Sequence, residues 1–241
     1  SEFRYRRPII TPGQLVIIIS QSGETADTLA AMREAKKQGA KVVAIVNVVG
    51  STIAREADAV LYTHAGPEIA VASTKAYNTQ LIAIYMIALE LARLSGAMDM
   101  ARYTQMAEGL SRIPGLMNKV LENKEQLARV ASRSFSQSSV FFIGRGLDYV
   151  LSMEASLKLK EISYIHSEAY AAGELKHGTI ALIEQGTLVV ALATQGALLE
   201  KTISNIKEVK ARGAQVLAVC FEGTHLPEDI ADEVVYLPRT D

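Results

Sequence analysis

The sequence predicts an α/β fold in which parallel sheets are flanked by helices, and two observations support this prediction. First, residues 15–62 and 189–236 repeat each other at a constant offset, so that Gln21 matches Gln195. Second, each stretch runs from a short apolar segment through a helical pattern to another short apolar segment. This order is typical of a βαβ unit with a buried parallel sheet. The chain is therefore interpreted as a duplicated α/β unit.

The first copy contains three expected strands and two expected helices. In order, these are a strand at 15–19, a helix at 25–38, a strand at 42–46, a strand at 59–62 and a long apolar helix at about 73–94. Gly39 and Gly96 follow the two helices, where glycine commonly ends a helix. We expect residues 1–98 to form the first subdomain.

Residues 99–136 are rich in charge and are interpreted as a helical connector to a second subdomain at 137–241. The elements expected there are a strand at 140–143, a helix at 149–163, a loop at 164–179, a strand at 188–193, a helix at 198–212 and strands at 216–220 and 234–236. Each copy has elements that its counterpart lacks. We therefore expect the chain to be truncated at both ends of a longer protein.

Composition favours a folded protein that binds a small polar or anionic ligand. The 241 residues are 49% hydrophobic with a formal net charge of −1, and the basic residues are scattered. This pattern argues against nucleic-acid and membrane-surface partners. The single cysteine, Cys220, lies in an apolar run, so no disulfide or thiolate metal site is proposed and a cytoplasmic location is expected. No signal peptide or membrane-spanning segment is recognised.

The first copy carries a hydroxyl-rich loop, Ser-Gln-Ser-Gly-Glu-Thr at 20–25, where the second reads Thr-Gln-Gly-Ala-Leu-Leu. In an open parallel sheet, ligands bind where strands end and helices begin. The hydroxyls of Ser20, Ser22 and Thr25 and the amide of Gln21 suit the oxygens of a phosphate monoester. A nucleotide is disfavoured because the loop has no lysine and no G-x-G-x-x-G pattern. The alternative is that these hydroxyls only cap a helix.

A second polar cluster follows in residues 154–178. Glu154, Lys158 and Glu161 share one helical face, and a solvated ladder of charges is the simpler interpretation of the helix alone. The next residues add His166 and His177 with further carboxylates. A carboxylate that moves a proton between adjacent carbons and an imidazole that opens a ring would suit an aldose–ketose isomerase. The spacing matches no zinc motif, so no metal is predicted.

The loop at 64–75 again follows a strand and precedes a helix. Ser73 or Thr74 is expected to be a plain helix N-cap. The backbone at Val71 is expected to line the same cleft as the hydroxyl-rich loop.

These residues resemble the sugar-isomerase (SIS) domain family and, within it, the isomerase half of the glutamine–fructose-6-phosphate aminotransferases. The 20–25 run is shared across the family, whereas the runs at 158–178 and 68–75 are similar to these aminotransferases in particular. The resemblance covers essentially the whole chain. It implies two flavodoxin-like SIS subdomains with parallel sheets flanked by helices.

The resemblance also implies an activity, namely formation of glucosamine 6-phosphate from fructose 6-phosphate and glutamine-derived ammonia, without a cofactor. It implies that Ser20, Gln21, Ser22 and Thr25 hold the sugar phosphate. It implies that Glu161 is the acid/base beside Lys158, and that His177 opens the ring from the neighbouring subunit of a homodimer. A glutaminase domain belongs to such enzymes and is not in this sequence, so the fragment is expected to be inactive alone. A non-catalytic phosphosugar sensor and a fructosamine-phosphate deglycase remain the alternatives.

Overall fold

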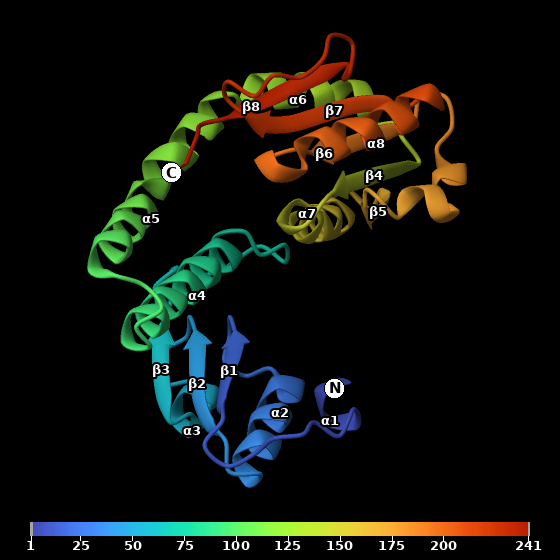
Figure 1. The fold of residues 1–241 in the computed structure, drawn as a ribbon. Coiled ribbons are helices and arrows are strands. Elements are labelled where there is room, and N and C mark those ends of the chain that lie inside the picture. Colours follow the sequence, from blue (N-terminus) through green and yellow to red (C-terminus); the bar gives the residue numbers. More distant parts are fainter. Residues whose placement is uncertain (1, 241) are drawn as a thin grey trace. The chain divides into compact units, whose positions relative to one another are not determined.

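A computed structural model describes residues 2–240, and the chain divides between Leu110 and Ser111 into two compact units. Each unit contains one parallel sheet with helices packed against it (Figure 1). The boundary between the units falls inside helix α5 (Met100–Glu122). The α/β class with parallel sheets flanked by helices is confirmed.

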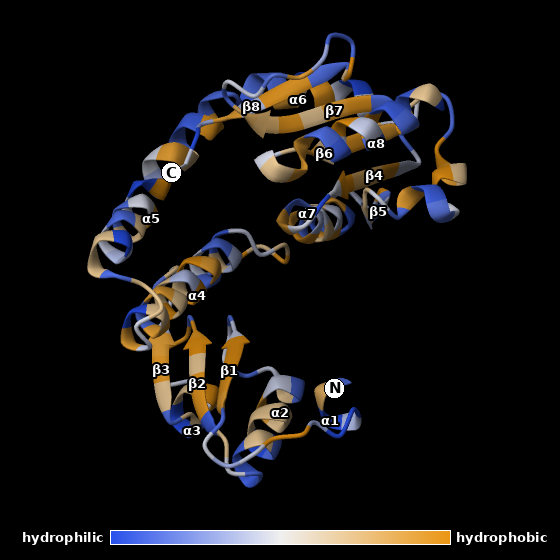
Figure 2. Cartoon of the chain, in the orientation of Figure 1, coloured by the Kyte–Doolittle hydropathy of each residue, from blue (hydrophilic) through white to orange (hydrophobic). Residues whose placement is uncertain are grey.

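The first unit is built on three strands in the order β1-β2-β3, all parallel. Its elements are α1 (Glu2–Tyr5), β1 (Leu15–Ser20), α2 (Ala26–Lys37), β2 (Lys41–Val46), α3 (Thr52–Glu56), β3 (Ala59–Tyr62) and α4 (Lys75–Leu94). One face of the sheet packs against α2 and α3, where Met32 and Ile53 are fully buried with Val42. Figure 2 shows the three strands as largely hydrophobic. The predicted strands and long helices of this unit are confirmed.

The second unit contains five parallel strands in the order β5-β4-β6-β7-β8. After α5 come α6 (Lys124–Ser134), β4 (Ser139–Gly144), α7 (Leu147–Ser163), β5 (His166–Ala171), the 3-10 turns η1 (Leu175–His177) and η2 (Thr179–Leu182), β6 (Leu188–Leu192), η3 (Gly196–Leu198), α8 (Leu199–Ala211), β7 (Gln215–Phe221) and β8 (Glu233–Leu237). Ile206 and Val209 of α8 are fully buried against Val189 of β6. The strand order changes direction beside β4: β5 lies on one side of β4, and β6, β7 and β8 follow on its other side.

The internal repeat is visible in a contact that both units contain. In the first unit, the Val42 N–H donates to Asp58 Oδ2 (2.8 Å) and the Asp58 N–H donates to the Val42 carbonyl (2.9 Å). In the second unit, Val216 and Asp232 make the same two bonds, at 2.6 Å and 2.9 Å. This reciprocal pair, here called the strand bracket, holds the chain before β3 or β8 against the start of the preceding strand. The duplication is therefore structural as well as sequential.

One sequence expectation is wrong, because residues 166–171 form strand β5 and not part of a loop. β5 pairs in parallel with β4 from Ser139↔His166 to Gly144↔Ala171. Its residues are polar because it lies at the edge of the sheet, with a single strand neighbour in the described chain. Ser167 is nevertheless fully buried, and its hydroxyl bonds that of Ser156 on α7 at 2.9 Å. The sequence did not indicate a strand because His166 and Glu168 occupy alternate positions where apolar residues would be expected.

Candidate functional site

The carboxyl ends of β1, β2 and β3 form one open pocket in the first unit. Gln21, Asn47 and His64 follow the three strands in turn and line this pocket with Val48, Gly66 and Pro67. Asn47 ties two of these segments together, since its Oδ1 accepts from the Ala65 N–H (2.8 Å) and its Nδ2 donates to the Gly66 carbonyl (2.7 Å). A parallel sheet offers its ligands this edge. The predicted loop residue Gln21 therefore lies at a site open to a ligand.

The hydroxyls of the 20–25 loop bond mainly to one another and to the backbone of the loop. Ser20 Oγ accepts from the Gly23 N–H (3.0 Å) and lies 3.0 Å from Thr25 Oγ1. Ser22 Oγ accepts from the Glu24 N–H (3.2 Å). Thr25 occupies the N-cap position of α2, yet its side chain makes no capping hydrogen bond. Capping by Thr25, the simpler interpretation of this hydroxyl, is therefore wrong.

These bonds leave hydroxyl protons for a ligand. A hydroxyl that accepts a hydrogen bond still has its own proton to donate, and this applies to Ser22. In the Ser20–Thr25 pair one hydroxyl donates to the other, so one further proton remains. The N-terminus of α2 adds the positive end of the helix dipole. Together with the Gln21 amide, this donor set suits a phosphate group, and the assignment of these four residues to phosphate stays a prediction.

Gly23 is required by the geometry of the loop. It has a φ of +67°, which L side chains rarely adopt, and a Cβ at this position would lie 2.0 Å from Ser51 Oγ. Both the backbone conformation and the close approach therefore exclude any larger residue.

The loop before α4 is arranged differently from the sequence expectation. Glu68 Oε2 accepts from the Ala76 N–H (3.1 Å) and from the Ser73 hydroxyl (3.4 Å), so Glu68 caps this helix. Thr74 stands at the N-cap position without a side-chain cap bond. The expected cap by Ser73 or Thr74 is wrong because a carboxylate, a stronger acceptor, reaches back from the loop. Val71 is 95% exposed, and its backbone role in the cleft stays a prediction.

In the second unit, α7 brings Glu154, Lys158 and Glu161 together as predicted. Lys158 Nζ lies 2.6 Å from Glu161 Oε2 and 3.5 Å from Glu154 Oε1. The three side chains are only 20–28% exposed, which distinguishes the cluster from a freely solvated ladder of charges. The hydrogen bond to Glu161 raises the pKa of Lys158 above its ordinary value, against the opposing effect of burial. The cluster therefore holds the Lys158 ammonium group between two carboxyl groups.

His177 is not joined to this cluster. It ends the short turn η1, is exposed, and makes no side-chain hydrogen bond or ion pair within the described residues. His166 lies instead on β5, where its Nε2 is 3.1 Å from Glu168 Oε1. The part assigned to His177 therefore stays a prediction.

The second copy of the loop is occupied by a carboxylate of the chain itself. Asp148, at the start of α7, is fully buried. It accepts from the Thr194 N–H (2.8 Å), the Thr194 hydroxyl (2.5 Å) and the Gln195 N–H (3.3 Å). Thr194 and Gln195 correspond to Ser20 and Gln21. Because the Asp148 side chain already takes these donors, only the first copy leaves its loop donors available to a phosphate.

Sequence reasoning did not identify Asn47 as a site residue, although a polar residue directly after a buried strand was a signal for it.

Among residues 2–240, no group of histidine, cysteine, aspartate or glutamate side chains is arranged to hold a metal ion. None of the helices described is both long and apolar enough to cross a membrane.

Comparison with known proteins places these features in a family. The SIS domain model matches residues 1–90 and 135–239. A glutamine–fructose-6-phosphate aminotransferase of Caldanaerobacter subterraneus is 59% identical over 240 residues, and one of Clostridium tetani is 58% identical over 240 residues. The whole chain aligns, but it spans about 40% of the length of these relatives. The C-terminal domain of the Francisella tularensis glucosamine-fructose-6-phosphate aminotransferase has 39% identity and a TM-score of 0.95, covering 100% of this chain and 68% of that one.

Proposed function

The chain belongs to the SIS domain family, and we propose that it is the isomerase part of a glutamine–fructose-6-phosphate aminotransferase. The reaction would convert fructose 6-phosphate and glutamine-derived ammonia to glucosamine 6-phosphate, which feeds amino-sugar synthesis. The observation that carries this proposal is the partly buried Lys158–Glu161 pair. A module that only binds a phosphosugar needs the hydroxyl-rich loop but no group that moves a proton.

In this proposal the two units have different tasks. The loop formed by Ser20, Gln21, Ser22 and Thr25 holds the phosphate and so fixes the sugar. Glu161 takes a proton from one of the sugar carbons C1 and C2 and returns it to the other. Lys158 lies beside it, with its Nζ 2.6 Å from Glu161 Oε2. The Val71 backbone lines the sugar cleft.

The proposal extends to partners. His177, which is exposed, would open the sugar ring in the site of the neighbouring subunit, so the protein would act as a homodimer in the cytoplasm. A glutaminase domain in the rest of the protein would supply the ammonia. The aldose–ketose step uses acid–base groups only, so no cofactor is assigned.

The first experiment is an assay of the full-length protein for glucosamine 6-phosphate from fructose 6-phosphate and glutamine. Calorimetric titration with fructose 6-phosphate, with unphosphorylated fructose as the control, would accompany it. We expect phosphate-dependent binding and product formation. Binding without turnover would favour the sensor, and hydrolysis of fructosamine phosphates in place of synthesis would favour the deglycase. No phosphate-dependent binding would refute the loop assignment.

A further inference from the structure

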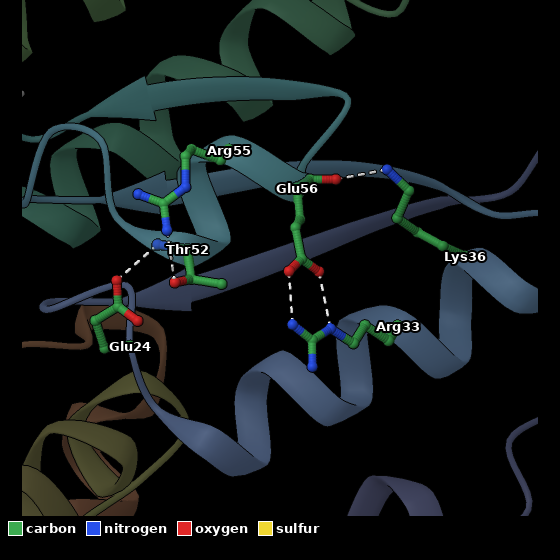
Figure 3. Close-up of polar contacts among 6 residues, drawn as sticks. All are labelled: Glu24, Arg33, Lys36, Thr52, Arg55 and Glu56. Carbon is green, nitrogen blue, oxygen red and sulfur yellow. Dashed lines mark hydrogen bonds and ion pairs between the residues drawn. The ribbon is translucent and has the colours of Figure 1, made fainter.

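The 20–25 loop is attached to the segment that follows β2 by three hydrogen bonds. The Asn47 N–H donates to the Gln21 carbonyl (3.1 Å), and the Ile53 N–H donates to the Gly23 carbonyl (3.0 Å). The third is made by a side chain, because the Thr52 N–H donates to Glu24 Oε1 at 2.7 Å. Figure 3 shows the Glu24 carboxylate directed at the first turn of α3. Each of these three bonds therefore fixes a residue of the loop.

Glu24 is an unexpected residue at an anion site. It immediately precedes Thr25 and α2, so its negative charge lies close to the place proposed for the phosphate. Like charges repel, and Coulomb's law alone predicts that this carboxylate weakens phosphate binding. The side chain is instead turned to the Thr52 N–H. That hydrogen bond lowers the pKa of Glu24 from its ordinary value, so the carboxylate remains ionised and attached at neutral pH.

The helix that receives Glu24 is itself fixed at its far end. Arg33 of α2 makes two bonds to the Glu56 carboxylate, at 2.8 Å and 2.6 Å, and Lys36 Nζ donates to the Glu56 carbonyl at 2.6 Å (Figure 3). At the other end of α3, Ser51 is buried directly against Gly23. α3 is thus held at both ends and can serve as a rigid support.

We propose that Glu24 is a positioning residue, whose carboxylate anchors the phosphate loop to α3 and so holds Ser22 and Thr25 in their binding geometry. It follows that removing the oxygen that accepts the Thr52 N–H weakens the binding of an anionic sugar, although a negative charge is removed with it. The inference rests on the proposed function, since it assumes that the loop binds a phosphosugar. Glutamine keeps an oxygen that can accept the Thr52 N–H, whereas alanine removes the anchor.

The test compares Glu24→Ala and Glu24→Gln with wild type in the full-length protein. Fructose 6-phosphate is titrated at low and at high salt, and KM and kcat are measured separately. Glu34→Ala and Glu34→Gln are the matched controls, because Glu34 lies on α2, directly after the loop, and its side chain bonds only Gln38 among the described residues. Salt screens a charge effect between exposed groups but does not restore a lost anchor.

We expect Glu24→Ala to weaken binding and raise KM by about tenfold, which is the value of one hydrogen bond to a charged group. The effect should persist at high salt with kcat little changed, and Glu24→Gln should stay close to wild type. Equal or tighter binding by Glu24→Ala, or equal losses in both Glu24 variants, would overturn the anchor. Failure of the wild type itself to bind fructose 6-phosphate would instead refute the proposed function, and the anchor with it.

Discussion

The three hydroxyls of the phosphate loop are not equivalent as donors. Ser22 Oγ accepts the Glu24 N–H, so its own proton is directed elsewhere. Ser20 and Thr25 share one hydrogen bond, and only one of their two protons is left over. If Thr25 is removed, Ser20 recovers its proton for the ligand. Phosphate binding should therefore depend more on Ser22 than on Thr25.

We expect Ser22→Ala to weaken fructose 6-phosphate binding by about 1–3 kcal/mol, the range for a charge-assisted hydrogen bond. Thr25→Ala should cost less, and the double variant should cost most. Calorimetric titration measures the losses, with Thr79→Ala as the control because its hydroxyl bonds only the carbonyls of its own helix. Unchanged binding in the double variant would remove these hydroxyls from the site.

Glu161→Gln separates binding from chemistry. Glutamine keeps the size of the side chain but cannot take a proton, so turnover should be abolished while the affinity for fructose 6-phosphate changes little. Kinetics and titration of the same preparation provide both values, and Lys160→Gln on the exposed side of α7 is the control. Retained turnover in Glu161→Gln would exclude this carboxylate from the mechanism.

At residue scale the sequence pointed to Gln21, which lines the pocket, and to the charged cluster on α7, because polar residues at strand ends and at helical spacing can be recognised in a linear pattern. It did not predict Asn47, whose side chain makes three hydrogen bonds to the segment after β3. It also could not predict that Glu68, rather than Ser73 or Thr74, caps α4. The Asn47 bonds join segments that are distant in sequence, and at α4 several side chains could accept the same N–H group. The periodicity of apolar residues contains no information on either.

At the scale of elements, apolar strands were predicted well and polar ones were not. β1, β2 and β6 consist largely of apolar residues, and each lies where the sequence placed it. β5 was missed because an edge strand needs fewer apolar residues. α3 was missed because five residues are too few for a helical period to be visible.

The strand bracket of the second unit makes stability depend on pH. Burial opposes ionisation of Asp232, but the Val216 N–H and the Lys210 ammonium outweigh it and lower the pKa. A lowered folded-state pKa stabilises the fold above the unfolded value, about 3.9, and this stabilisation is lost as the pH falls through the folded value. Asp232→Asn should therefore lower the free energy of unfolding at neutral pH by about 1 kcal/mol, a small value because the side chain is 47% exposed.

Urea unfolding over a range of pH would test this effect. The difference between wild type and Asp232→Asn should disappear in acid, whereas Asp229→Asn, in an exposed turn, should match wild type throughout. A difference that is independent of pH would show that ionisation of Asp232 is not its source.

At the scale of the whole molecule, the two copies share their architecture but not their chemistry. β1, β2 and β3 correspond to β6, β7 and β8, and both sets are parallel. Only the first copy leaves the loop after its first strand open to an anion, because Asp148 fills the equivalent place in the second. The second copy contributes α7 with Lys158 and Glu161 instead.

The proposed homodimer predicts complementation between two inactive proteins. If His177 acts in the neighbouring subunit, a mixed dimer of Glu161→Gln and His177→Ala has one site with both native residues and one with neither. Half of the dimers in an equal mixture are mixed, so activity should recover to about a quarter of wild type in a twofold-symmetric dimer. The mixture is refolded together and assayed, with the two variants kept separate as the control. No recovery would mean that both groups come from one chain.

The strand brackets at Asp58 and Asp232 are also consistent with an internal duplication of the gene. After a gene doubles internally, the need to fold constrains both halves alike, whereas the need to bind a ligand constrains only the half that binds it. The bracket residues are identical in the two halves, whereas residues 194–199 differ from the 20–25 run at every position but Gln195. In related sequences we expect the bracket residues to vary little in either half. We expect the second loop to vary more, except where its residues donate hydrogen bonds to Asp148.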